Sequence, residues 1–90
     1  MMTDERVNEL TLKYKQHRGF IPSETTFDSA IGISVRGAVA YMRNSGVSAT
    51  LLDAESDMDV YILHGTDDMY EKGELTSTFV NLVIQMRMSS

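Results

Sequence analysis

The chain has 90 residues, with 13 acidic and 8 basic side chains, no cysteine and a net charge of −5. This length predicts one domain, residues 1–90, and the lack of cysteine excludes disulfides and thiolate metal sites. No apolar run approaches the roughly 18 residues of a membrane span and no signal peptide is evident, so we expect neither membrane insertion nor secretion. Residues 1–46 carry 6 basic and 5 acidic side chains, a net of +1, whereas residues 47–90 carry 2 and 8, a net of −6. A fold that separates these halves would have a charge dipole.

The first predicted helix runs from Asp4 to about His17. Thr3 is a suitable N-cap, and acidic residues precede basic residues along the segment, as the helix dipole favours. Gly19 is expected to end the helix. Its apolar stripe consists of Val7, Leu10 and Tyr14.

The segment Phe27–Arg43 fits either a helix or a strand, because its β-branched residues also alternate. About seventeen residues without a turn signal are long for a strand and ordinary for a helix, so we predict a helix. Glycine costs about 1 kcal/mol inside a helix, and this cost is more plausible where helices cross closely. We therefore expect close crossings at Gly32, Gly37 and Gly65. The sequence after residue 43, Asn-Ser-Gly, is a stop signal.

Two more helices are predicted in tandem near the C-terminus, Asp53–Lys72 and Thr76–Met86. Asp53 serves as the N-cap of the first, and Gly73 ends it in the left-handed conformation. Residues 47–52 are expected to form a short link, with one helical turn capped by Ser48. Since the connections are short, we predict an all-α fold, a small antiparallel helical bundle of about four helices. The predicted core consists of Phe27, Ile31, Val35, Tyr41, Met58, Tyr61, Ile62, Met69, Phe79, Leu82 and Val83.

The sequence offers little support for catalysis or metal binding. The alternating acids from residue 53 to residue 59 resemble a calcium loop, but its sixth position is Met58 and its twelfth is His64. A helix N-terminus explains these acids better. His64 and Asp68 lie four residues apart on a predicted helix, yet no third ligand accompanies them. Neither a nucleophile with its base nor a phosphate-binding loop is present. We therefore expect no enzyme activity, no catalytic residues, no metal and no cofactor.

The order of short motifs resembles that of the small head–tail connector (adaptor) proteins of tailed bacteriophages and prophages. The motifs are Tyr41-Met-Arg-Asn-Ser-Gly-Val47, Leu51-Leu-Asp53, Gly65-Thr-Asp-Asp-Met-Tyr-Glu-Lys-Gly73 and Leu75-Thr-Ser-Thr-Phe-Val-Asn-Leu-Val-Ile-Gln-Met86. The resemblance covers residues 27–86 and depends on the order and spacing of the motifs. The chain departs from the pattern at Asp67, which is usually apolar, at Thr78, which is often proline, and in its short link at residues 73–75.

This resemblance implies a structural virion protein at the head–tail junction, synthesised in the cytoplasm of a bacterial host. Such a protein assembles as a homo-oligomeric ring beneath the portal protein and extends the DNA channel. The ring docks the next stopper or tail-completion protein, and DNA passes through it without specific binding. The family is not enzymatic and needs no cofactor.

The uneven charge suggests how neighbouring subunits would meet in such a ring. Each subunit of a closed ring uses two different surfaces, and opposite charges make such surfaces complementary. We predict that Arg36 and Arg43 meet acidic residues of the next subunit. The acidic candidates are Asp57, Asp67 and Glu71. The terminal residues Met86, Arg87 and Met88 are candidates for docking a partner protein.

A different class of function is also compatible with the sequence. A soluble acidic regulator, either a DNA mimic or a partner-binding inhibitor, would use the same acidic face as a monomer or dimer. The acidic C-terminal half repels DNA phosphates, which suits either a DNA channel or a mimic of DNA. Composition does not choose between these two readings.

Overall fold

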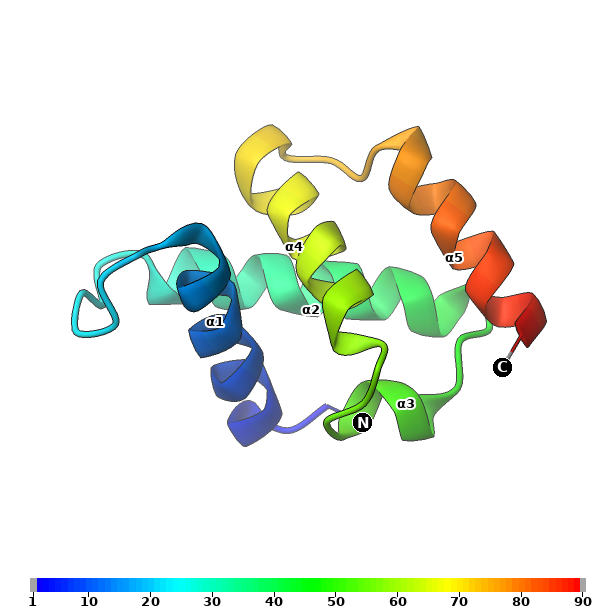
Figure 1. Ribbon diagram of the computed structural model, residues 1–90, viewed down its shortest axis with the longest axis horizontal. Coiled ribbons are helices and arrows are strands. Elements are labelled where there is room, and N and C mark those ends of the chain that lie inside the picture. Colours follow the sequence, from blue (N-terminus) through cyan, green and yellow to red (C-terminus); the bar gives the residue numbers. More distant parts are fainter. Residues whose placement is uncertain (1, 90) are drawn as a thin grey trace.

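The structure is a computed structural model that describes residues 2–89, with side chains described for residues 2–87. It contains five helices in the described range, shown in Figure 1: α1 (Asp4–Arg18), α2 (Asp28–Asn44), α3 (Ala49–Asp53), α4 (Asp59–Lys72) and α5 (Ser77–Ser89). None of the described residues forms a strand. The all-α prediction is therefore confirmed, and the strand alternative for the second element is wrong.

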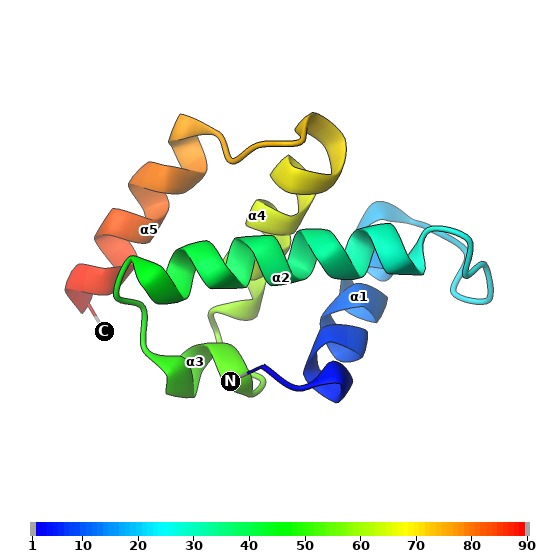
Figure 2. The same cartoon turned by 180° about the vertical axis from the view of Figure 1, so that it is seen from behind.

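The longest helix, α2, forms one layer, and α1, α4 and α5 lie against one side of it (Figures 1 and 2). The molecule measures 38 × 25 × 17 Å. Arg6 near the start of α1 contacts Asp59 at the start of α4, and Arg18 at the end of α1 contacts Glu71 near the end of α4. The neighbours α1 and α4 are therefore parallel. The antiparallel arrangement expected from short connections does not hold for this pair, because the chain crosses along α2 between them.

The helix ends are set by local sequence, as predicted. The Oγ1 atom of Thr3 accepts a hydrogen bond of 3.1 Å from the backbone N–H of Arg6, which caps α1. Gly19 and Gly73 follow α1 and α4 with φ angles of 75° and 76°. In that left-handed region glycine has no Cβ to clash, so both residues end their helices as expected.

The predicted helix Asp53–Lys72 is wrong in its first turns. Asp53 ends the short helix α3 instead of capping the long one, and α4 begins only at Asp59. Ala54 takes an extended conformation, and the hydroxyl of Ser56 donates to the carbonyl of Leu51 at 2.6 Å. The chain therefore turns between α3 and α4. Ser48 precedes α3 as expected, but its side chain makes no capping hydrogen bond.

Five of the predicted core side chains are buried and five are partly buried. The buried ones are Ile31, Val35, Ile62, Phe79 and Val83, and the partly buried ones are Tyr41, Met58, Tyr61, Met69 and Leu82. Phe27 is the exception, with 49% of its surface exposed. Phe27 was predicted to lie on the apolar face of this helix, but α2 begins one residue later, so Phe27 lies outside the helix.

Of the three helical glycines, Gly65 of α4 lies closest to a neighbouring helix. A Cβ atom at this position would lie 2.6 Å from the Phe79 ring and 2.9 Å from the Cβ of Ala38. At Gly37 the nearest atom would be the flexible end of Met69 at 3.2 Å, and at Gly32 the contact would be an ordinary 3.5 Å. The expected close crossing is therefore confirmed at Gly65, where α2, α4 and α5 meet.

Candidate functional site

A cluster of charged side chains joins the starts of α1 and α4. The guanidinium of Arg6 is 3% exposed and donates to Asp59 through two nitrogens, at 3.2 and 2.5 Å, and also to Glu9. Its Nε donates to the carbonyl of Leu52 at 3.0 Å, at the end of α3. Lys13 donates to Asp59 at 2.7 Å and to Glu55 at 2.6 Å. Two cations therefore hold three carboxylates together.

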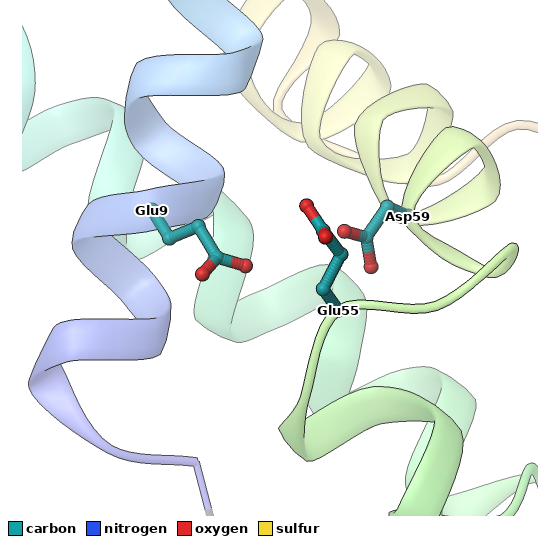
Figure 3. Close-up of side chains that lie close together, drawn as sticks. All are labelled: Glu9, Glu55 and Asp59. Carbon is teal, nitrogen blue, oxygen red and sulfur yellow. The ribbon is translucent and has the colours of Figure 1, made fainter.

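The three carboxylates of this cluster have the spacing of a metal site. Glu9 on α1, Glu55 on the α3–α4 link and Asp59 on α4 point towards one another (Figure 3), with ligand oxygens within 4.8 Å. However, Arg6 and Lys13 already donate hydrogen bonds to all three. Burial raises the pKa of Asp59, but the hydrogen bonds from these two cations outweigh it and hold that pKa below its usual range. The arrangement is chemically that of a structural ion-pair cluster.

A second cluster joins the ends of the same two helices. The hydroxyl of the buried Tyr14 donates to Asp67 at 2.9 Å. Arg18 donates to Asp67 and to the Tyr14 oxygen at 3.1 Å, and it forms an ion pair with Glu71 at 2.8 Å. Burial, followed by the bond to Asp67, raises the pKa of Tyr14. Asp67 therefore has a defined polar role between α1 and α4.

Four of the five predicted subunit-interface residues form ion pairs within the chain. Arg36 pairs with Asp4 at 2.5 Å, and Arg43 pairs with Asp53. Asp67 and Glu71 both pair with Arg18. The fifth candidate, Asp57, is exposed and lies in the turn before α4. These are pairs within one chain, so the predicted contacts of Arg36 and Arg43 with acidic residues of the next subunit stay a prediction.

The fold does not keep the two halves of the chain apart. Arg6, Lys13 and Arg18 of the basic half all pair with acids of the acidic half. The helix that carries these cations packs beside the helix that carries the acids, so the opposite charges meet inside one molecule. A count of charges along the chain misses this result because it contains no information on which helices are neighbours.

The predicted docking residues at the C-terminus differ in their surroundings. Met86 is only 7% exposed and belongs to the core cluster, so its placement on an exposed tail is wrong. Arg87 is exposed and its guanidinium lies 3.5 Å from the carbonyl of Ser45. The backbone of Met88 belongs to α5, whereas its side chain lies outside the described residues.

His64 and Asp68 lie on one face of α4, as predicted from their spacing. His64 Nε2 is 3.8 Å from the Asp68 carboxylate, and the His64 ring stacks on Phe79. Asp68 is buried and accepts hydrogen bonds from the backbone N–H and hydroxyl of Thr76, at 3.1 and 2.6 Å. The Thr76 oxygen in turn lies 3.4 Å from the backbone N–H of Phe79. Asp68 therefore holds the start of α5, and this role explains its burial without a metal.

Sequence reasoning missed the large apolar side chains that the fold leaves in water. Ile21 and Ile33 are each 68% exposed, and Val60 is 70% exposed. Two hollows of about 260 Å³ each are lined mainly by apolar residues. One is lined by Met58, Tyr61, Leu82, Gln85 and Met86, and the other by Gly19, Phe20, Ile21, Glu24 and Phe27. The signal available in the sequence was the run Phe-Ile-Pro at residues 20–22, which lies between helices and outside either apolar stripe.

Among the described residues, no helix is both long and apolar enough to cross a bilayer. A scan against models of known protein families found no match, and searches of curated proteins and of solved structures found none either.

Proposed function

We propose that this protein is a structural head–tail connector of a tailed bacteriophage or prophage. The observation that carries the proposal is the order and spacing of four motifs over residues 27–86. In the proposed role the protein forms a ring beneath the portal, extends the DNA channel and docks the next stopper or tail-completion protein. Its place is the head–tail junction of the virion, and it neither binds DNA specifically nor catalyses a reaction.

The compact all-helical fold supports this proposal in part. Three of the four motifs meet at one place, since Tyr41 of α2 and Gly65 of α4 both contact Phe79 of α5. The motifs thus describe one packing unit, as a family signature does. The large exposed apolar side chains also suit a subunit that is covered by neighbours on assembly.

The ion pairs within the chain change the proposed mechanism of assembly. Contacts between subunits through Arg43, Asp67 or Glu71 would have to replace pairs that these residues already make. Exchanging one exposed pair for another gains little, about 0–1 kcal/mol. We therefore assign the larger share of the assembly energy to apolar contacts. The same pairing weakens the acidic-regulator alternative, because a DNA mimic needs acids that are not neutralised by its own cations.

The test is electron microscopy of the purified protein with and without portal assemblies. The proposal expects rings on the portal, even when the protein alone is a monomer in dilute solution. If the protein binds no portal but binds a repressor or nuclease tightly, the regulator alternative replaces the proposal. A matched variant, Arg43→Glu, tests the charge contact separately: unchanged rings would exclude the predicted role of Arg43 while leaving the connector function intact.

A further inference from the structure

Two methionines from different parts of the chain line one hollow between α4 and α5. Met58 immediately precedes α4, and Met86 lies near the end of α5. The hollow is open, has a volume of about 260 Å³ and is completed by Tyr61, Leu82 and Gln85. A water molecule occupies about 30 Å³ in the liquid, so the hollow admits a molecule as small as hydrogen peroxide. A small oxidant therefore reaches both thioethers without unfolding of the chain.

The two methionines differ in what surrounds them. Met58 is partly buried and packs against the edge of the core, whereas Met86 is 7% exposed and belongs to the core itself. Oxidation converts the flexible, apolar thioether of methionine into a polar sulfoxide. On Met58 the new oxygen can reach water. On Met86 it would be a polar group inside an apolar core, which is costly unless the side chain leaves the core.

The start of α5 does not depend on these methionines. The hydroxyl and backbone N–H of Thr76 bond to Asp68 at 2.6 and 3.1 Å, and the Phe79 ring packs over Gly65. The end of α5 is held in part by the burial of Met86. A chemical change at Met86 therefore acts on the end of the helix and leaves the bonds at its start intact.

We propose that Met58 and Met86 form an oxidation site that releases the end of α5 from the core. A peroxide transfers one oxygen atom to each sulfur: its O–O bond breaks, the sulfur loses two electrons, and the peroxide is reduced to water. The sulfoxide of Met86 then leaves the core and takes the last turns of α5 with it. Methionine sulfoxide reductases reverse this modification. The inference goes beyond the proposed function and does not depend on it, since it concerns the packing within one chain.

Peroxide treatment of the full-length protein tests the access of the oxidant. Peptide mass spectrometry follows the oxidation of each methionine over time. Met42 is the matched control, because it is a core methionine with no exposed surface and does not line the hollow. Met58 and Met86 should oxidise at least about tenfold faster than Met42. Equal rates for Met86 and Met42 would mean that unfolding admits the oxidant, and this result overturns the inference.

Hydrogen exchange of the oxidised protein tests the structural consequence. The amides of residues 83–87 should exchange about tenfold faster or more after oxidation, whereas those of residues 80–82 should keep their protection. Treatment with a methionine sulfoxide reductase should restore the original rates. Unchanged exchange at residues 83–87 overturns the inference, as does a loss of protection along the whole of α5.

A doubly substituted chain, Met58→Leu with Met86→Leu, assigns the effect to these two sulfurs. Leucine has nearly the volume of methionine and contains no sulfur, so the variant should fold with similar packing. It keeps the other five methionines of the chain. Under the same peroxide treatment its exchange rates at residues 83–87 should not change. Faster exchange in this variant would assign the release to another methionine and overturn the inference.

Discussion

The two sides of α4 are held by different chemistry. On the α1 side, ion pairs join both ends of the helices, from Arg6–Asp59 at the start to Arg18–Glu71 at the end. On the α5 side, hydrogen bonds from Thr76 to Asp68 hold the start of α5, and the contact along the helix is apolar and centres on the Phe79 ring over Gly65. The first interface places charges at fixed points along two parallel helices, whereas the second brings a ring against bare backbone.

This difference suggests that one kind of contact orients the helices and that another kind supplies most of the stability. A buried ion pair loses hydration on folding, so its net contribution is small, although removal of one partner is costly. Buried apolar area has no such opposing cost. We infer that the ion pairs fix the register of α1 against α4, and that the apolar contacts of α5 supply the larger net stabilisation. Variants on the two sides of α4 test this division.

The largest loss is expected from Phe79→Ala. The ring is fully buried against α2 and α4, and truncating such a ring costs about 3–5 kcal/mol, close to the whole stability of a small domain. Urea titration followed by circular dichroism measures the loss. The control is Ile84→Ala on the same helix, where 39% of the side chain is exposed and a loss of about 1 kcal/mol or less is expected. Equal losses would contradict the central role of this ring.

On the other side of α4, Asp59→Ala should cost about 3 kcal/mol, because it leaves the buried side chain of Arg6 with the half-exposed Glu9 as its acidic partner, beside the Leu52 carbonyl. Glu55→Ala is the matched control, since Glu55 pairs with the same Lys13 but is 71% exposed. Its expected cost is about 0–1 kcal/mol. Thermal and urea unfolding of both variants give the difference. A loss from Glu55→Ala as large as that from Asp59→Ala would show that burial does not govern this interface.

A smaller effect is expected where a methyl group is added between the helices. Gly65→Ala places a Cβ at 2.6 Å from Phe79, and overpacking of this kind costs about 1–3 kcal/mol. Alanine also has a higher helix propensity than glycine, which offsets up to about 1 kcal/mol of this cost. Gly37→Ala gains the same propensity but meets only the movable end of Met69, so it should be neutral or stabilising. The urea midpoint should therefore fall for Gly65→Ala and stay the same or rise for Gly37→Ala.

The sequence could predict the features that neighbouring residues decide. The cap at Thr3 and the left-handed glycines at positions 19 and 73 depend on a few adjacent residues, and all three are confirmed. The apolar periodicity also identified most of the core. These features repeat at short spacing, so no knowledge of the tertiary structure is needed to recognise them.

Features that depend on distant residues could not be predicted in this way. The break before Asp59 accompanies a bond from Arg6 to Leu52, which lies 46 residues away. The alternating acidic residues 53–59 could belong to a helix start or to a turn. Their sequence does not distinguish the two until the contact with Arg6 is known. The pairing of the basic and acidic halves has the same origin, because it follows from α1 lying beside α4.

The smallest expected effect is a change in how stability depends on pH, and it isolates the ion-paired side of α4. The pKa of Asp59 is lower in the folded protein than its ordinary value. The unfolded carboxyl titrates near about 3.9, so its stabilising contribution is complete above that pH and is lost as the pH falls through the lower, folded pKa. Asp59→Asn removes this contribution, so the gap in unfolding free energy between wild type and variant should narrow between about pH 5 and pH 2. Phe79→Ala changes no titrating group, so the difference in unfolding free energy between wild type and this variant should stay nearly constant over that range. A constant gap for Asp59→Asn would mean that the Asp59 carboxylate is not held by Arg6 and Lys13, and the parallel register of α1 and α4 would need another cause.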